Sequence, residues 1–256
     1  MWTWKTWQGK RYLTCELLSQ PHGFFTSAFY PISQHELVQA LSNSAQAYRG
    51  KQVHGNTVLT PSQIQKAPQN EEGYAFTDGL MSDSSDQALF VLTADCTPAL
   101  LEDQSTGKVA VVHAGWQGTA LGIVKKAAQR MLDDGTQPGD LRIALGPAIA
   151  GEMYQVGEEV ALEVAQSLYP MDNMPSTEEI FRQGLAGDNP YLLPDPKPGH
   201  YRLNTRRVSE IQLLQLGLQP DQIATAPHCT FQEPETFFSY RRTGEKKNQW
   251  SGIVSR

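Results

Sequence analysis

The chain has 256 residues, 39% of them hydrophobic, with a formal net charge of −6 at pH 7, so it is long enough for one large domain over residues 1 to 256. Its Lys and Arg residues are scattered and form no basic stripe, which argues against nucleic acid as a partner. No apolar run reaches the about 18 residues that span a bilayer, and the first residues lack the pattern of a secretory signal, so we expect a cytoplasmic protein with no membrane partner.

The first elements predicted along the chain are strands around one helix. Apolar residues alternate with polar ones over residues 2 to 18, which predicts one or two half-buried strands. Helical spacing of apolar residues predicts a helix over 34 to 47. Residues 51 to 59 are strand-like on both sides of a Gly-Asn break. Polar residues with Pro and Gly predict a surface loop over 61 to 75, before a turn at 77 to 79.

The densest apolar region follows and predicts three buried strands, over residues 87 to 94, 97 to 101 and 108 to 113. Pro98 indicates that the second of them is an edge strand or is kinked at its start. A helix is then predicted to begin with Thr119 as its N-cap residue. Three of its side chains are expected to face the core: Val124, Ala128 and Met131.

The second half of the chain alternates strands, helices and one long irregular stretch. We predict a strand over 141 to 145, helices over 157 to 168 and 204 to 216, and strands over 236 to 239 and 250 to 254. Residues 170 to 200 are rich in Pro, Gly, Asp and Asn and predict a surface excursion with a short helix at 177 to 183. With no repeat and no boundary visible, the fold class is α+β, a single domain of mixed β-sheets covered by helices.

Cys96 and His113 are brought together by the predicted strands. A hairpin turning near residue 105 pairs residues whose numbers sum to about 210, so Cys96 faces the neighbourhood of His113. Opposite Cβ atoms lie about 5 Å apart, close enough to share a metal ion or a proton. The three cysteines of the chain are an odd number spread far apart, which favours free thiols or a metal role over disulfides.

His54 is the third candidate ligand. It follows a strand at the Gly-Asn break, an unusual position for a purely structural imidazole. Two imidazoles and a thiolate suit Zn²⁺, and three protein ligands leave a fourth position open, as in catalytic zinc sites. From the residues alone, Cys96 could equally be a small buried hydrophobic residue, and His113 a hydrogen-bonded structural histidine.

Further polar residues have both a functional and a structural interpretation. Arg241 and Arg242 could clamp a phosphate group, or could be surface charges whose stems pack on neighbouring aromatic rings. Backbone N–H groups of residues 115 to 119 could bind an anion or form an ordinary turn. Asp95 could orient a ligand, transfer a proton or end a strand. The pair at residues 228 and 229 lacks a third metal ligand in the sequence and is interpreted as structural.

Five segments resemble, in order, the YfiH family, also called multicopper polyphenol oxidase-like or laccase-domain proteins. The segments are Gln-Val-His-Gly at 52 to 55, Thr-Ala-Asp-Cys at 93 to 96, His-Ala-Gly-Trp-Gln-Gly-Thr at 113 to 119, Gly-Pro-Ala-Ile at 146 to 149 and Phe-Phe-Ser-Tyr-Arg-Arg at 237 to 242. The resemblance implies that His54, Cys96 and His113 bind Zn²⁺ and that mixed sheets are covered by helices. It also implies an enzyme, a purine nucleoside phosphorylase acting on adenosine, inosine, guanosine and methylthioadenosine, with adenosine deaminase activity. Its small-molecule partners would be purine nucleosides and phosphate.

The chain departs from the usual family pattern at two positions that are commonly Arg. Gln117 stands at one of them, and Ser27 at the other. Family members also commonly have a Cys pair where this chain has Glu and Met at 152 and 153. We therefore expect Arg241, Arg242 and the backbone of residues 115 to 119 to hold the phosphate.

Three other functions remain open at this stage. Cys96 could be a nucleophile activated by His113 in a metal-free hydrolase. An editing role in cell-wall precursor synthesis is attached to bacterial relatives. A copper-dependent polyphenol oxidase is suggested by the family's name, but a multicopper site needs more His ligands than this set supplies.

Overall fold

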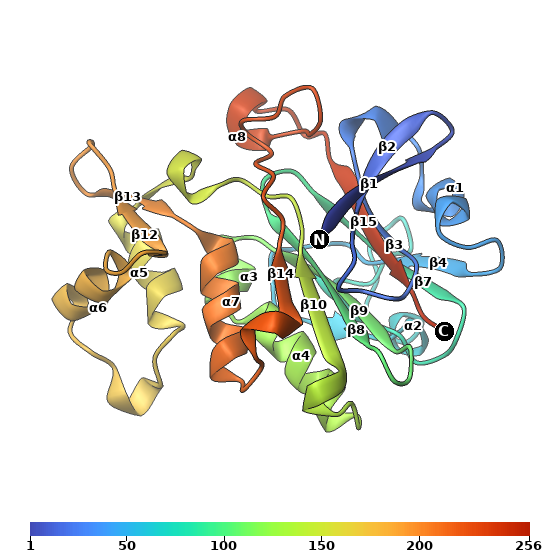
Figure 1. Cartoon of the computed structure of the whole chain (residues 1–256), viewed down its shortest axis with the longest axis horizontal. Helices are drawn as coiled ribbons and strands as arrows, with labels where there is room; N and C mark the ends of the chain where they lie inside the picture. The colour runs from blue at the N-terminus through green and yellow to red at the C-terminus, as the bar shows by residue number, and fades with distance from the viewer.

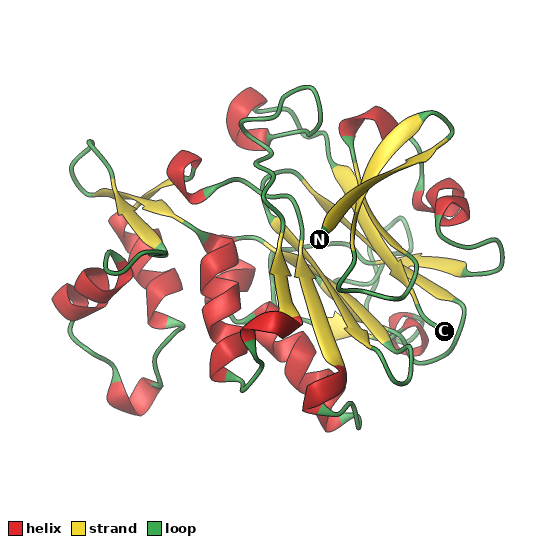
Figure 2. Cartoon of the chain, viewed as in Figure 1, coloured by secondary structure: helices red, strands yellow, loops and turns green.

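The chain folds into two six-stranded β-sheets and a smaller three-stranded sheet, with helices packed on them (Figure 1, Figure 2). This is a computed structural model that describes residues 1 to 256. The first sheet has the order β1 (Trp2–Trp7), β2 (Lys10–Cys15), β3 (His22–Phe25), β15 (Gln249–Val254), β7 (Gln87–Thr93) and β4 (Gln46–Arg49). The second has the order β14 (Ile223–Thr225), β10 (Leu141–Leu145), β8 (Thr97–Asp103), β9 (Val109–Ala114), β6 (Gly79–Met81) and β5 (Val58–Leu59). The third has the order β11 (Gln155–Gly157), β13 (His200–Leu203) and β12 (Leu192–Pro194).

Eight α-helices complete the structure. They are α1 (Gln34–Leu37), α2 (Pro61–Ile64), α3 (Trp116–Ala120), α4 (Ile123–Asp133), α5 (Glu158–Gln166), α6 (Thr177–Gly184), α7 (Thr205–Gln215) and α8 (Tyr240–Thr243). None of these helices combines the length and the apolar character needed to cross a lipid bilayer. The predicted mixture of β-sheets and helices is confirmed.

The two large sheets pack face to face, and side-chain alternation decides which residues meet. In β8 and β9, Leu100 and Val111 lie in a core cluster with residues of the first sheet. Their neighbours Leu101 and Val112 lie instead in a cluster with α4 and α7 on the opposite face. Because both faces of these strands are buried, their sequences are continuously apolar rather than alternating. The same alternation places His113 on the face of β9 that points toward the first sheet.

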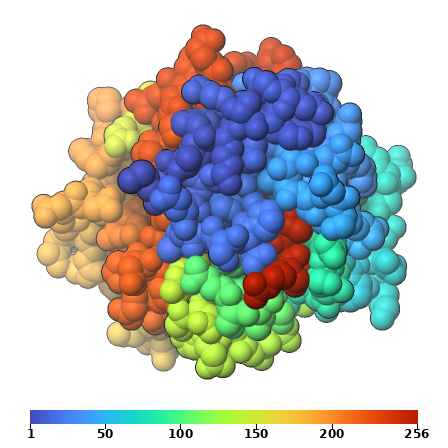
Figure 3. Space-filling view, turned by 45° about the vertical axis from the view of Figure 1, so that its right-hand side comes forward, coloured from blue at the N-terminus to red at the C-terminus, as the bar shows by residue number.

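Two connections between the large sheets position the candidate site. The chain leaves β4 in the first sheet and enters β5 in the second, and His54 lies on this connection. It crosses again between β7 and β8, where Cys96 lies. In Figure 3 the carboxyl-terminal residues, in red, lie between the blue amino-terminal segment and the green hairpin, and the N–H of Arg256 donates to the carbonyl of Gly107 at 3.1 Å.

Several predicted elements are confirmed. The strands over 87 to 94, 97 to 101, 108 to 113, 141 to 145 and 250 to 254 correspond to β7, β8, β9, β10 and β15. The helices over 157 to 168, 177 to 183 and 204 to 216 correspond to α5, α6 and α7, and two strands, β1 and β2, lie within residues 2 to 18. Three predicted core residues of α4 are buried: Val124, Ala128 and Met131.

The predicted helix over 34 to 47 is too long. It ends after α1 and a short 3₁₀ turn, and Gln46–Arg49 forms β4, paired in parallel with β7. Ser42 ends the helical stretch, because its hydroxyl accepts the N–H groups of Ser44 and Ala45, both at 3.2 Å. Such a local bond competes with helix continuation.

Other predictions in loops are also wrong. β6 begins at Gly79, inside the predicted turn, and α2 interrupts the predicted loop over 61 to 75. Thr119 is not an N-cap, since it lies inside α3 and its hydroxyl donates to the carbonyl of Gly115 at 2.9 Å. Residues 236 to 239 form no strand and instead lead into α8. α2 has a local signal that the prediction missed, a capping box between Thr60 and Gln63. The other segments are short, and the local pattern did not distinguish them.

The stretch over 170 to 200 is more than a surface excursion. α6 and β12 bury Ile180 and Leu192 completely, in a separate core cluster with α5 and β13. Figure 1 shows this unit of helices and short strands at one end of the molecule, beside α7. Its polar composition lies in the connecting turns, whereas the apolar residues form its core.

Candidate metal centre

His54, Cys96 and His113 converge at the junction of the two large sheets. Their nearest ligand atoms all lie within 4.8 Å of one another, and the two imidazole rings meet edge to face with centroids 4.8 Å apart. His113 is buried, Cys96 is half-buried and His54 is exposed. The group, called the ligand triad below, is therefore closed on the protein side and open toward solvent at His54.

Asp78 is the buried anchor of the triad. Its carboxylate accepts the consecutive backbone N–H groups of Val53, His54 and Gly55 at 3.0, 2.9 and 2.9 Å. It also accepts the Nδ1–H of His113 at 2.8 Å. These contacts hold the His54 backbone at a left-handed φ of 61°, and they direct Nε2 of His113 away from Asp78. A carboxylate behind a ligand imidazole is the usual way that proteins fix a metal-binding histidine.

The electrostatics of the triad favour a thiolate. Burial by itself would raise the pKa of the Cys96 thiol, but the positive charge of His113 and hydrogen bonds from His113 and His54 lower the pKa to about 6. Burial would lower the pKa of His113, yet Cys96 and Asp78 raise it to about 9. The pKa of Asp78 is lowered, because hydrogen bonds from His113 and the backbone outweigh its burial. The cluster thus stabilises negative charge on sulfur, which is the form of cysteine that binds metals.

Gly115 allows the backbone to pass close to the triad. A Cβ atom at this position would lie 2.9 Å from Cδ2 of His54 and 3.1 Å from Sγ of Cys96. Its φ of −73° is ordinary, so the requirement for glycine comes from space rather than from backbone conformation. Any larger residue would displace two of the three candidate ligands.

The predicted hairpin is correct to within one residue of register. Pro98 lies opposite His113 and Thr97 opposite Ala114, so Cys96 is the residue just before β8 rather than directly across from His113. Of the two alternatives predicted for Pro98, the edge strand is wrong, because β8 lies between β10 and β9. Pro98 has no N–H to donate, but its carbonyl accepts the N–H of Gly146, just after β10, at 2.8 Å.

A cavity of about 420 Å³ opens in front of the triad; we call it the cleft. Its volume is within the range of about 300 to 1,000 Å³ that is usual for small-molecule sites. The cleft is bordered by segments that are far apart in the sequence, from β4 to the loop before β15. Besides the triad, its lining includes charged and aromatic side chains, among them Arg49, Lys51, Tyr240, Glu245 and Lys246.

The predicted phosphate ligands Arg241 and Arg242 lie beside the cleft and are not among the residues that line it. Arg241 donates to the carbonyl of Gln155 at 2.7 Å and lies over the ring of Tyr154 at 4.9 Å. Arg242 donates at 2.6 to 2.9 Å to three backbone carbonyls, those of residues 230, 231 and 237. Most of the donor capacity of Arg242 is thus used within its own loop.

The remaining sequence candidates have structural contacts. Asp95 accepts the Thr230 hydroxyl and the backbone N–H of Arg241, both at 2.7 Å, and so fastens the start of α8. His228 pairs with Glu233 at 2.9 Å. The Cys229 sulfur accepts a backbone N–H at 3.2 Å. The structural interpretation of these three residues agrees with their contacts.

The two positions that depart from the family pattern are also away from the cleft lining. Gln117 is exposed on α3, and the Ser27 hydroxyl donates to the carbonyl of Thr236 at 3.1 Å. Residues 115 to 119 form most of a short helix rather than an open loop.

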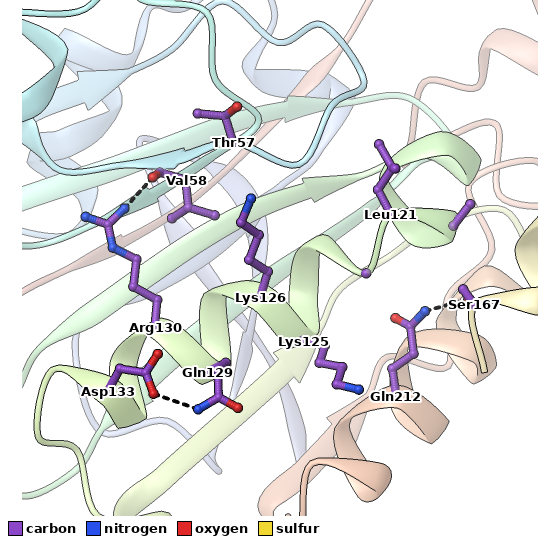
Figure 4. Close-up of a pocket in the computed structure, with 12 residues that line it drawn as sticks. Thr57, Val58, Leu121, Lys125, Lys126, Gln129, Arg130, Asp133, Ser167 and Gln212 are labelled. Atoms are coloured by element: carbon purple, nitrogen blue, oxygen red, sulfur yellow. Dashed lines mark hydrogen bonds between the residues drawn. The ribbon is translucent and has the colours of Figure 1, made fainter. Parts of the chain in front are cut away.

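A larger cavity of about 640 Å³ lies elsewhere, along the exposed side of α4 (Figure 4). Lys125 projects toward Gln212 on α7, and Lys126 projects toward the Thr57–Val58 segment. None of the triad residues lines this cavity. Size alone therefore does not identify the reactive site, and we assign the chemistry to the cleft.

Comparison with known proteins identifies the relatives of the chain. A family model described as multi-copper polyphenol oxidoreductase laccase matches residues 33 to 256. A purine nucleoside phosphorylase of Synechocystis sp. is 48% identical over 257 residues, which cover 100% of this chain and 97% of the relative. The adenosine deaminase RL5 of an unknown prokaryotic organism is 30% identical over 167 residues, which cover 65% of this chain and 57% of that protein. The crystal structure of YlmD from Geobacillus stearothermophilus has the same fold, with a TM-score of 0.79, 23% identity and coverage of 99% and 98%.

Proposed function

Because this chain belongs to the multi-copper polyphenol oxidoreductase laccase family, we propose that it is a zinc-dependent purine nucleoside phosphorylase with adenosine deaminase activity. The observation that carries the proposal is the ligand triad in the lining of a cleft of about 420 Å³. The relative that is 48% identical over the whole chain supports the same reaction. Adenosine, inosine, guanosine and methylthioadenosine are the proposed substrates, with phosphate as the second substrate.

The residues of the site fit zinc. His54, Cys96 and His113 supply two imidazoles and a thiolate, and the open side of the triad faces the cleft, as in zinc sites that keep one position for substrate. A blue-copper site uses a similar set with a weak axial Met or Gln. No Met lines the cleft, and the amide of Gln52 is already bonded to the backbone of Leu92 at 2.7 and 2.8 Å. The donors therefore favour zinc over copper, and the ion would supply Lewis-acid stabilisation to the bound purine.

Tyr240 is the residue best placed to receive the purine ring. It lines the cleft and is 54% exposed, which is unusual for a large aromatic side chain. Aromatic rings stack on nucleobases without regard to the base, which suits an enzyme with several purine substrates. We propose that Tyr240 orients the nucleoside while the cleft walls limit the access of water to the glycosidic bond.

The assay for this function uses zinc-loaded enzyme with adenosine, inosine, guanosine or methylthioadenosine. With inorganic phosphate present, each cleaved nucleoside should release its free base and the corresponding sugar 1-phosphate, and omission of phosphate should stop cleavage. Inosine formed from adenosine reports deamination separately. If all four nucleosides stay intact in the presence of zinc and phosphate, the proposed function is wrong.

A metal-free cysteine hydrolase is the second candidate, because Asp78, His113 and Cys96 form a carboxylate, imidazole and thiol relay. In such enzymes the imidazole activates the thiol as a nucleophile. Removal of the metal with a chelator distinguishes the two functions. A hydrolase of this kind keeps its activity after chelation, whereas the phosphorylase loses activity and recovers it when zinc is restored.

A further inference from the structure

We propose that Arg49, Lys51 and Lys246 form an anion subsite of the cleft that binds inorganic phosphate. All three cationic side chains line the same cavity as the ligand triad. The use of this phosphate in nucleoside cleavage rests on the proposed function, whereas the binding of phosphate can be measured without it. The assignment differs from the sequence-based prediction, which gave the phosphate to Arg241 and Arg242.

Arg49 provides a fixed guanidinium group with an unused donor. Its guanidinium carbon lies 3.8 Å from the centre of the Tyr74 ring and 5.7 Å from that of Trp250. Its Nε is buried and has no hydrogen-bond partner, and its only ion pair, with Glu72, is long at 3.7 Å. Buried donors are nearly always bonded in proteins, so a missing partner points to a ligand. A planar guanidinium held by stacking is well suited to a phosphate oxygen.

The backbone holds Arg49 and Lys51 in a fixed relation to each other. The intervening Gly50 passes so close to Thr77 that a Cβ atom would lie 2.3 Å from its Cγ2. The backbone of Lys51 is bonded to the segment next to Thr77, since its N–H donates to the carbonyl of Ala75 at 2.8 Å. In extended backbone, side chains two residues apart lie on the same side. Both cations therefore face the cleft on the segment that continues to the triad.

Lys246 approaches the cleft from the loop between α8 and β15. It forms no ion pair, and neither does Lys51, whereas the nearby Glu245 is paired with Lys247 at 2.9 Å. The acidic groups that face these residues are Glu245, which is paired with Lys247, and Glu72, which lies 3.7 Å from Arg49. Three cations with so little compensation create a positive potential at this end of the cleft, which attracts a dianion.

The position of the subsite suits the proposed reaction. A phosphate oxygen forms a bond to C1′ of the ribose while the bond from C1′ to the purine nitrogen breaks. The electron pair of the broken bond stays on the purine, which takes the proton released by the phosphate. An anion held on the cleft wall, with the purine near Tyr240, brings both reactants into one cavity and so lowers the entropic cost of their meeting.

The subsite is tested by titrating zinc-loaded protein with inorganic phosphate in a calorimeter, without nucleoside. The cleft variants are Arg49→Gln and the double variant Lys51→Gln/Lys246→Gln, whose two changed residues lie at the surface, so that folding should stay intact. Arg241→Gln is titrated in the same way to test the alternative phosphate ligand. Loss of a charged partner weakens an anion contact by roughly tenfold to over a hundredfold, and we expect that range for the phosphate Kd. The matched control is Lys125→Gln/Lys126→Gln in the α4 cavity, which removes the same charge away from the cleft.

The outcomes separate the subsite from the proposed function. Unchanged phosphate affinity in both cleft variants, or an equal loss in the α4 control, overturns the subsite. Loss confined to Arg241→Gln also overturns it and returns the phosphate to that residue. If the cleft variants lose phosphate binding but the wild-type enzyme cleaves no nucleoside, the subsite stands and the proposed function fails.

Discussion

At the scale of single residues, the centre depends on groups that the sequence does not mark as functional. Asp78 stands in a Thr-Asp-Gly stretch that indicates a turn, yet it receives four hydrogen bonds that fix His113 and the backbone at His54. Gly115 belongs to a recognisable motif, but the reason for glycine there appears only when His54 and Cys96 are placed against it. Residue chemistry and spacing brought the three ligand candidates forward and the family resemblance singled them out, whereas their supports depend on tertiary contacts.

Asp78→Asn should weaken zinc binding by about 10- to 100-fold, the usual effect of removing the support of a ligand. An amide presents N–H donors where the carboxylate accepts N–H groups, so the loop at His54 and the ring of His113 should both lose their fixed positions. Zinc affinity is measured by competition with a chromogenic chelator. Asp172→Asn, an exposed change of the same kind, is the control, and equal zinc affinity in both variants would refute the supporting role of Asp78.

Gly115→Ala should also reduce zinc affinity, by a similar factor, because the added methyl group contacts His54 and Cys96. Gly139→Ala is a suitable control, since no atom lies within 4 Å of a Cβ at that position. The zinc content of the two variants after dialysis measures this loss of affinity. Full occupancy in Gly115→Ala would show that the two ligands are not held where the structure has them.

Tyr240→Ala should raise the KM for adenosine about tenfold or more, because stacking contributes about 1 to 3 kcal/mol per base. Tyr240→Phe keeps the ring and should retain most of the affinity. Steady-state kinetics at saturating phosphate measure the effect, and the KM for phosphate should change much less. A Tyr240→Ala enzyme with an unaltered KM for every nucleoside would remove this residue from the substrate site.

At the scale of elements, long apolar runs were predicted well and short polar segments were not. β7, β8 and β9 are buried on both faces, so their sequences leave little ambiguity. The predicted helix over 34 to 47 was too long because the apolar spacing there is compatible with a helix, while β4 is set by pairing with β7. The register of β8 and β9 was wrong by one residue because the turn is centred between Ser105 and Thr106 rather than on residue 105, which shifts each pair by one.

The N-cap of α7, Asn204, allows a test of the fold that does not depend on metal binding or catalysis. Its side chain accepts the N–H of Arg207 at 3.1 Å as the N-cap of the helix. Asn204→Ala should lower the free energy of unfolding by about 0.5 to 2 kcal/mol, as measured by urea denaturation. Zinc content should stay unchanged, since α7 supplies no ligand; a variant of full stability would show that the cap contributes nothing.

At the scale of the whole molecule, the candidate ligands tie the two large sheets together. His54 and Cys96 lie on two of the connections between the sheets, and His113 lies in β9 on the face toward the first sheet. An ion bound by all three would link both sheets at one end. A ligand that binds only the folded state stabilises it in proportion to its affinity, so zinc should raise the Tm of the whole chain rather than of one part.

The most direct test of the central claim combines metal analysis with the phosphate-dependent assay in wild-type and Cys96→Ala proteins. We expect about one zinc ion per wild-type chain, with release of adenine and ribose 1-phosphate from adenosine only when phosphate is present. Cys96→Ala should lose most of the zinc and the activity together. Full zinc occupancy in Cys96→Ala, or phosphate-dependent cleavage by metal-free wild-type enzyme, would contradict it.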